Sequence, residues 1–323
     1  MRTVIVTGGG GFIGSNLCKY ILDHSSYRVV ALDNLSHGSL SNLESCLQNP
    51  NFEFKQLDIF DISKIDFKVS KNDVIVHLAA GKIPRYTDAL DTLKTNGMGS
   101  NSVFEFAAKN QLKTIAASTS EVYGKNPETP FSEGSDLVVG NPDVKKWSYA
   151  ISKMYEEQLL YAYSSKFDFP AALVRFFGAF GINQSLDWLG GPIPVFIEKA
   201  IRLEPIQVHG DGSQTRSFTF IDDHVFALFR LIELEWSGCD HFNLGSSREI
   251  SILSLAQNIW SQINPDVEPK IEFLPYETFG KYEDVMRRVP DTSKAKSFLG
   301  LPDPTGFDIS LRKTIEWQKK FYV

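Results

Sequence analysis

A tyrosine and a lysine four positions apart are the residues of this chain best suited to move a proton. Tyr149 and Lys153 fall in a stretch with helical spacing, where side chains four positions apart lie on one face. A nearby ammonium group lowers the pKa of a phenol toward working pH, so the phenolate can accept a proton. The hydroxyls of Ser118, Thr119 and Ser120 end an upstream strand and could hydrogen-bond the same substrate oxygen. The alternative is an ordinary surface pair, which is common when such a motif stands alone.

A glycine-rich turn near the start of the chain predicts a dinucleotide site. Glycines recur at positions 8, 11 and 14, after the β-branched run 4–6 and before a stretch with helical spacing. Backbone N–H groups at such a turn can approach a pyrophosphate at a helix N-terminus, where the helix dipole favours negative charge. The next apolar run, 28–32, ends on Asp33, whose carboxylate suits ribose hydroxyls and repels a 2′-phosphate. This context favours NAD over NADP, and over a glycine loop that binds nothing.

The two features together predict the oxidation of a secondary alcohol. A nicotinamide beside Tyr149 would accept a hydride while the phenolate takes the hydroxyl proton. The small residues Ala79 and Ala80, which follow an apolar run, would let a cofactor approach closely. The residues predicted to contact NAD are Gly8, Gly11, Phe12, Ile13, Gly14, Asp33, Asn34, Asp58, Ile59, Leu78, Ala79, Ala80, Ser118, Tyr149 and Lys153.

Strand-like and helical stretches alternate along the first half of the chain. Buried strands are expected at 4–6, 28–32, 52–56, 73–78, 114–117 and 171–176, with helices at 89–108 and from 148. This alternation predicts an α/β fold with a doubly wound, parallel Rossmann-type sheet. Later helices are expected at 192–203, 222–234 and 307–321, and a hairpin at 210–213. We therefore expect an NAD-binding Rossmann domain at 1–177 and a smaller α+β part at 178–323 that mainly binds substrate.

The composition narrows the class of protein. The chain has 323 residues, of which 42% are hydrophobic, so it can bury a large core. A net charge of −6 without a basic stripe disfavours nucleic acid as a partner. Cys18, Cys46 and Cys239 are too scattered for a disulfide framework or a zinc site, and the histidines lack ligand spacing, so no metal is predicted. A core strand begins at once and no apolar run is long enough to span a membrane, so a cytoplasmic protein without membrane contact is expected.

Several motifs spread along the chain resemble those of one enzyme family. They are TGGGGFIG at 7–14, HLAA at 77–80, SEVYG at 120–124, YAISK at 149–153, GDGSQTR at 210–216 and RRVPD at 287–291. Over nearly its whole length the chain resembles an extended short-chain dehydrogenase/reductase of the nucleotide-sugar epimerase, dehydratase and decarboxylase group. The resemblance implies that NAD stays bound and that carbon 4 of the sugar is oxidised to a ketone. In epimerases and decarboxylases of this group the same NADH then returns its hydride.

Two arginines are expected to bind the substrate. The guanidinium group matches phosphate oxygens with two parallel hydrogen bonds, and a buried nucleoside diphosphate needs such partners. Arg216 and Arg288 each stand in a motif of the resemblance, although either alone would more often be a solvated surface residue. The implied partner is a nucleoside-diphosphate sugar, and a UDP-linked one is favoured.

The resemblance also implies a homodimer. In this group, two helices of each subunit form the interface: the helix that carries the tyrosine and the lysine, and the long helix before it. Together with the same two helices of the partner they make a four-helix bundle. Ile151, Met154, Leu159 and Tyr163 could serve either the core or such an interface.

The residues around Glu121 bear on the reaction that follows oxidation. Dehydratases of the group usually carry Asp-Glu before Val-Tyr-Gly, and Ser120 in place of that aspartate argues against 4,6-dehydration. The sequence Thr119-Ser120-Glu121 is similar to UDP-glucuronate decarboxylases, in which the matching glutamate and arginine lie near the sugar carboxylate. Loss of carbon dioxide leaves an enolate, and Arg288 and Tyr282 could stabilise and protonate it. Glu121 could instead only orient the helix or Tyr149. A UDP-uronate decarboxylase is favoured over a UDP-hexose 4-epimerase.

Three departures from the pattern of the group concern the sugar pocket. Gly178 stands where an asparagine amide usually touches the substrate, and Ser217 stands where aspartate is common. Arg85, followed by Tyr86, lies close to where the sugar is expected, so it could pair with a uronate carboxylate or remain solvated. Two other classes of protein remain as alternatives: a nucleotide-sensing protein without catalysis and an NADP-dependent carbonyl reductase. The intact Tyr149 disfavours the first and Asp33 the second.

Overall fold

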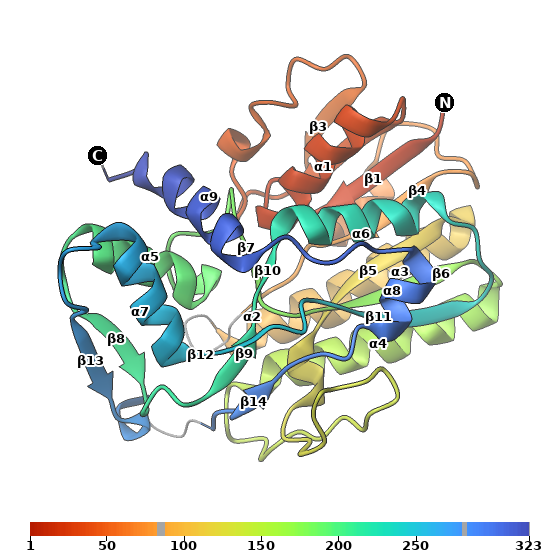
Figure 1. Cartoon of the computed structure of the whole chain (residues 1–323). Helices are drawn as coiled ribbons and strands as arrows, with labels where there is room; N and C mark the ends of the chain where they lie inside the picture. Colours follow the sequence, from red (N-terminus) through yellow and green to blue (C-terminus); the bar gives the residue numbers. More distant parts are fainter. Residues whose placement is uncertain (83–87, 280–282, 323) are drawn as a thin grey trace.

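Parallel strands form a seven-stranded central sheet (Figure 1). The computed structural model describes residues 1–82, 88–279 and 283–322. Across the sheet the strands are β11 (Cys239–Leu244), β6 (Ala171–Phe176), β5 (Lys113–Thr119), β4 (Val74–His77), β1 (Thr3–Thr7), β2 (Arg28–Asp33) and β3 (Phe52–Gln56). All except β11 fall on runs expected to be strands, so the predicted doubly wound α/β sheet is confirmed.

Helices cover both faces of this sheet. They are α1 (Phe12–His24), α2 (Ala89–Lys94), α3 (Ser100–Asn110), α4 (Trp147–Phe167) and α6 (Ile221–Glu233). Val4 and Val6 of β1 pack in one hydrophobic cluster with residues of α1 and α6, whereas Ile5 packs in another with residues of α3 and α4. Because both faces are covered, the strands read as continuous apolar runs instead of alternating patterns.

The expected helix at 89–108 is interrupted by a wider turn. A π-helical turn, Thr95–Gly99, separates α2 from α3. It carries Asn96, whose Nδ2 donates to the carbonyl oxygen of Gly81 at 2.9 Å and whose Oδ1 accepts from the N–H of Gly81 at 2.7 Å. The side chain of Asn96 thereby fixes the segment that leaves β4, and π-turns are common at such functional positions.

The C-terminal part adds helices and small sheets beside the main sheet. The helices are α5 (Pro192–Ile201), α7 (Ile252–Ile263), α8 (Ser293–Leu299) and α9 (Phe307–Lys319). The sheets pair β7 (Ala179–Phe180) with β10 (Thr219–Phe220), β8 (Ile206–His209) with β13 (Ile271–Leu274), and β9 (Thr215–Ser217) with β12 (Glu249–Ser251) and β14 (Arg287–Arg288). Short 3₁₀ turns lie at Leu40–Leu43, Ile59–Lys64, Ser120–Tyr123, Trp188–Gly190 and Tyr276–Phe279.

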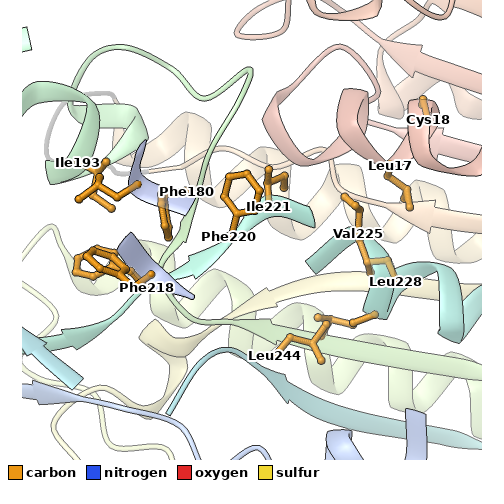
Figure 2. Packing of buried hydrophobic residues seen from close by; sticks show 14 of the residues in the cluster. Leu17, Cys18, Phe180, Ile193, Phe218, Phe220, Ile221, Val225, Leu228 and Leu244 are labelled. Atoms are coloured by element: carbon orange, nitrogen blue, oxygen red, sulfur yellow. The ribbon is translucent and has the colours of Figure 1, made fainter. Parts of the chain in front are cut away.

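One hydrophobic cluster joins the two parts of the chain. Phe180 and Phe218 of the C-terminal part belong to the same cluster as Leu17 of α1 and Val225 of α6, and Figure 2 shows these side chains. The strand β11 belongs to the main sheet and the helix α6 packs against it, although both follow residue 178. The expected division at 177/178 therefore does not coincide with the limits of the sheet.

The predicted hairpin at 210–213 is wrong. The turn exists, since Gly210 and Gly212 have φ of 66° and 75°. The flanking strands do not pair with each other, because β8 pairs with β13 and β9 pairs with β12 and β14. The two glycines among turn residues correctly indicate that the chain reverses here. The strands on either side of the turn, however, pair with strands from later in the sequence.

Other sequence-level expectations concern cysteines, metals and membranes. All three cysteines are unpaired; Cys18 and Cys46 are buried, and Cys239 is partly buried. Within the described residues, no group of three or more histidine, cysteine, aspartate or glutamate side chains is placed to hold a metal ion. In the same described ranges, no helix is both long and apolar enough to cross a bilayer.

Candidate active site

A cavity of about 420 Å³ lies where the carboxyl ends of β4, β5 and β6 meet the C-terminal part. Ligands of open parallel sheets bind in this position, outside the carboxyl ends of the strands. Of the predicted site residues, its lining includes Phe12, Ile13, Leu78, Ala80, Ser118, Thr119, Ser120, Glu121, Tyr149, Lys153, Gly178, Arg216 and Arg288. The fold thus brings the tyrosine–lysine pair, both arginines and the first two residues of α1 to one cavity, whereas Gly8, Gly11 and Gly14 are not part of its lining.

Tyr149 and Lys153 both line the cavity from α4, as their spacing predicts. The ammonium of Lys153 is buried, and its Nζ donates to the carbonyl oxygen of Ala117 and to Oε2 of Glu156, each at 2.8 Å. Burial and the carboxylates of Glu156 and Glu121 raise the pKa of Tyr149. The expected lowering of this pKa is wrong for this structure, because burial of the phenol and then the charges of Glu156 and Glu121 outweigh the hydrogen bond with Thr119.

The three hydroxyls at the end of β5 have different partners. Ser118 Oγ donates to Oε1 of Glu157 at 2.5 Å, so this hydroxyl is engaged with α4. Thr119 caps the short helix that follows, and its hydrogen bond to Tyr149 acts to lower the pKa of the phenol. Ser120 is buried and lines the cavity. Thr119 and Ser120 are therefore the hydroxyls best placed to share a substrate oxygen with Tyr149.

The glycine turn has the shape that a dinucleotide requires. A Cβ atom on Gly14 would lie 2.2 Å from the carbonyl oxygen of Gly8, and one on Gly8 would lie 2.7 Å from the backbone nitrogen of Ala79. Only glycine fits such close backbone contacts. The N-cap residue of α1 is Gly11, so the helix starts without a side-chain cap, and its first turn has no acidic residue. This helix start is suited to an anionic pyrophosphate.

The acidic end of β2 is joined to the glycine turn. Asp33 is buried, and its Oδ2 accepts a hydrogen bond from the N–H of Gly10 at 2.9 Å. Asn34 follows, and its Nδ2 donates to Oδ2 of Asp58 at 2.8 Å. Asp58 caps the short helix that begins at Ile59, which is itself buried. These residues form the edge of the nucleotide site that the sequence predicts for the adenosine.

Strand pairing places the two predicted arginines side by side. The parallel register of β9 and β14 aligns Arg216 with Arg288, and both line the cavity. Arg216 Nη2 donates to Oδ1 of Asp284 at 2.9 Å, and Arg288 Nη1 donates to Oε1 of Glu121. Each guanidinium is thus oriented by a carboxylate at the wall of the cavity.

The charges around Glu121 make it an anion and leave a titrating lysine beside it. Burial opposes ionisation of Glu121, but Arg288, Lys146 and Arg216 lower its pKa to about 2. Burial lowers the pKa of Lys146 to about 8, although Glu121 and Asp284 act in the opposite direction. Glu121 forms an ion pair with Arg288, a residue predicted to contact the substrate. The Glu121 carboxylate therefore lies among the cations that line this wall of the cavity.

The remaining predicted substrate residues have different outcomes. Gly178 lines the cavity with a φ of +50°, and a Cβ atom there would lie 2.0 Å from the carbonyl oxygen of Ser217. No side chain fits at this position, so Gly178 can offer only its backbone. Arg85, Tyr86 and Tyr282 lie outside the described residues.

Comparison with known proteins identifies the family. A model described as "NAD dependent epimerase/dehydratase family" matches residues 4–245. The chain belongs to this family. UDP-N-acetyl-alpha-D-glucosaminuronate decarboxylase of Bacillus cytotoxicus is 33% identical over 98% of this chain and 97% of its own length. UDP-glucuronic acid decarboxylase 6 of Arabidopsis thaliana is 32% identical over 92% of this chain and 83% of its own. The solved UDP-glucuronic acid 4-epimerase of Bacillus cereus, in complex with UDP-glucuronic acid and NAD, superposes with a TM-score of 0.86, 26% identity and coverage of 99% and 100%.

Membership of the NAD-dependent epimerase/dehydratase family confirms several predictions. The chain is an NAD-dependent enzyme of the extended short-chain dehydrogenase/reductase type. The close backbone contacts at Gly8 and Gly14 and the uncapped start of α1 at Gly11 fit the pyrophosphate of that cofactor. When bound, NAD supplies the acceptor for a hydride from the sugar. The prediction of a nucleotide-sugar enzyme is confirmed as well.

Sequence reasoning missed several charged residues of this family member. Lys146 lines the cavity, and the bare sequence offers only its nearness to Tyr149 as a signal. Arg175 of β6 forms two hydrogen bonds with Glu157 of α4, at 2.9 and 2.7 Å, which ties the strand end to the helix. Glu156 lies against Lys153. The pairing of Arg175 with Glu157 joins two elements and is visible only once the chain is folded, whereas the three-residue spacing of Lys153 and Glu156 on one helix was a signal in the sequence.

Proposed function

We propose that this enzyme decarboxylates a UDP-linked uronate through a 4-keto intermediate. The observation that carries the proposal is the charge of the cavity wall. Among the described residues, the charged side chains that line the cavity are the cations Lys82, Lys146, Lys153, Arg216 and Arg288 and the carboxylates Glu121 and Asp284. This excess of cations suits a diphosphate together with a sugar carboxylate. The names of the relatives support the same class of substrate.

Proton transfer at carbon 4 of the sugar is assigned to Tyr149. Its phenolate accepts the hydroxyl proton, and Thr119 and Ser120 hydrogen-bond the same oxygen. Bound NAD would supply the acceptor for the hydride of carbon 4 and return that hydride in the last step. The β-keto acid breaks its bond between carbons 5 and 6, so carbon dioxide leaves and the electron pair forms an enolate at the ketone. Arg288 stabilises the negative charge of that enolate. A proton then adds to carbon 5, and Tyr149 returns its proton as the ketone is reduced.

The two parts of the chain have different roles in this proposal. Residues 1–177 hold NAD, and residues 178–323 mainly hold the UDP group and the sugar. Arg216 of the second part is the phosphate partner, and it lines the same cavity as Ser120 of the first. The substrate would therefore bridge the two parts.

Product analysis tests the reaction. The protein is supplied with NAD and incubated separately with UDP-glucuronate, UDP-N-acetylglucosaminuronate and UDP-glucose. We expect carbon dioxide and a UDP-pentose from at least one uronate. An epimer without carbon dioxide would identify a 4-epimerase instead, which the solved epimerase with the same fold makes the second candidate. If none of the three substrates is converted, both subtypes fail.

We also infer that two copies of the chain associate through α2 and α4. Five large apolar side chains on α2, on α4 and on the π-helical turn after α2 are more than a third exposed: Leu90, Leu93, Met98, Ile151 and Tyr155. Exposed apolar patches of this kind mark protein interfaces. Of the other interface candidates, Met154, Leu159 and Tyr163 pack against the core clusters.

The unpaired cysteines support a reducing compartment such as the cytoplasm.

A further inference from the structure

Glu156 places a buried carboxylate beside the lysine of the tyrosine–lysine pair. It follows Lys153 by three positions on α4, and its side chain is 1% exposed. Its Oε2 accepts a hydrogen bond from Nζ of Lys153 at 2.8 Å. A buried carboxylate is costly unless a cation compensates its charge. Burial raises the pKa of Glu156, whereas the charge and the hydrogen bond of Lys153 act to lower it. Lys153 is therefore the group that favours the ionised carboxylate, and the two form an ion pair behind the cavity wall.

The other titratable groups around Glu156 do not replace Lys153 as its partner. From β4, His77 Nε2 lies 3.9 Å from Glu156 Oε1, but burial and the charge of Lys153 lower the pKa of His77 to about 3, so its ring is neutral. From α3, the hydroxyl of Ser100 lies 2.9 Å from the same ring nitrogen. The neighbouring carboxylate of α4, Glu157, is engaged with an arginine of β6.

On the cavity side, the remaining acid is also compensated. Glu121, in the short helix after β5, is paired with Arg288 of β14. Both Glu121 and Glu156 raise the pKa of Tyr149, but only Glu156 is bonded to the lysine that would stabilise the phenolate. The ammonium thus already contacts a carboxylate when a phenolate forms at Tyr149, which lies four positions earlier on the same face of α4.

We propose that Glu156 is a positioning residue: as the fixed counter-ion of Lys153, it competes with the Tyr149 phenolate for the ammonium and so sets the pH at which Tyr149 can accept a proton. The proposal rests on the proposed role of Tyr149 as the base. The three groups titrate as a set, since each charge depends on the other two. Glu156 also keeps the ammonium neutralised while Tyr149 carries the proton taken from the sugar.

The sign of the effect follows from the charges. Glu156→Gln removes the carboxylate that contacts the Lys153 ammonium and that raises the pKa of Tyr149. A nearby opposite charge favours the ionised form, so Tyr149 loses its proton at lower pH. We expect a shift of about one pH unit or more. Glu156→Asp keeps the charge and is expected to titrate closer to the unsubstituted protein than Glu156→Gln does.

Ultraviolet difference titration of tyrosinate measures this without any substrate. The absorbance of each protein is compared with that of its Tyr149→Phe counterpart over a range of pH, so that only Tyr149 contributes. Glu157→Gln is the matched control, because it removes the adjacent buried carboxylate, which does not contact Lys153. We expect the control to lose thermal stability and to keep the tyrosinate transition near its original pH. The acid limb of kcat/KM against pH should move in the same direction as the tyrosinate transition.

The outcomes separate this inference from the proposed function. An unchanged tyrosinate transition in Glu156→Gln would overturn the inference even if carbon dioxide is released from a uronate. A downward shift would support it even if every nucleotide sugar tested is left intact. Should Glu156→Gln not fold, Glu156→Ala leaves room for water beside Lys153 and must show the same downward shift. A shift to higher pH in either variant would also contradict the proposal.

Discussion

Single residues in the cavity act through compensated charges. Glu121 faces Arg288, and Asp284 faces Arg216, so each arginine is oriented before any ligand arrives. Preorganised arginines lose less conformational freedom when a phosphate binds. The same logic applies to Lys153, which a buried carboxylate holds at the cavity wall. Ion pairs at this site therefore serve position and proton affinity together.

Asp284→Asn tests how much the ion pair between Asp284 and Arg216 contributes to the free energy of unfolding. Burial opposes ionisation of Asp284, but Arg216, Lys146 and Arg288 lower its pKa to about 2 from a usual value of 3.8. A pKa lowered in the folded state stabilises the fold above the unfolded pKa, and this contribution is lost as pH falls from 3.8 through about 2. We expect Asp284→Asn to lower the free energy of unfolding at neutral pH by roughly 2 kcal/mol.

Urea unfolding at a series of pH values measures this difference. The gap between Asp284→Asn and the unsubstituted protein should be constant near neutral pH and shrink below about pH 4. Asp303→Asn is the control, because its carboxylate is 95% exposed beside Lys296 and such surface pairs contribute little. A gap that widens on acidification would contradict the assignment of the pKa.

Whole elements decide which side chains reach the cavity. The glycine turn between β1 and α1 is one case, since Gly14 packs directly on the backbone of Gly8. Gly14→Ala forces the turn apart, and we expect a loss of roughly 1–3 kcal/mol in the free energy of unfolding. The turn would also lose its fit to the pyrophosphate, so NAD should bind at least about tenfold more weakly.

Calorimetric titration with NAD and thermal unfolding measure both effects. Gly134→Ala is the matched control, because a Cβ atom there meets nothing within 4 Å. The control should bind NAD with unchanged affinity. Equal affinity in Gly14→Ala and Gly134→Ala would show that NAD does not use this turn.

The strand β14 also decides which side chain reaches the cavity, because neighbouring side chains on a strand point to opposite sides. Arg288 lines the cavity, whereas Arg287 is exposed and pairs with Glu249. We expect Arg288→Met to weaken binding of the favoured UDP-uronate by roughly 10- to 100-fold, since hydrogen bonds to charged groups are worth about 1.5–3 kcal/mol. Arg287→Met should bind it normally in the same calorimetric titration. A comparable loss in both variants would place the substrate elsewhere.

At the scale of the whole molecule, the cavity lies between two parts that share one hydrophobic core. This shared core fixes the distance between the glycine turn and the arginines. Beside α2 and α4, the π-helical turn Thr95–Gly99 carries Met98, which is 63% exposed. A second copy of the chain would cover Met98 together with the four other exposed apolar side chains of the proposed interface.

Met98→Glu tests that assembly. A charge buried in an apolar interface is strongly unfavourable, so we expect association to weaken by roughly tenfold or more. Analytical ultracentrifugation at micromolar concentration should show a dimer for the unsubstituted protein and monomers for the variant. Ile309→Glu on α9 is the control, because Ile309 is 61% exposed on a different face. A monomeric unsubstituted protein would refute the dimer.

Much of the fold and part of the site follow from local patterns of residues. Short apolar runs that end in small or polar residues identified six of the seven strands of the sheet, since a strand buried on both faces must be apolar throughout. The four-residue spacing of Tyr149 and Lys153 placed both on one helix face, because helix geometry is local. The glycines of the first turn were recognisable for the same reason.

Contacts between distant segments were decided only by tertiary structure. The hairpin expected at 210–213 depended on which strands would pair, and the pairing of β9 with β14 instead brought Arg216 beside Arg288. The proton affinity of Tyr149 was misjudged because burial and Glu156 outweigh what spacing alone suggests. Periodicity records how one segment meets a core, whereas charge compensation and strand partners depend on the free energy of the whole packed chain.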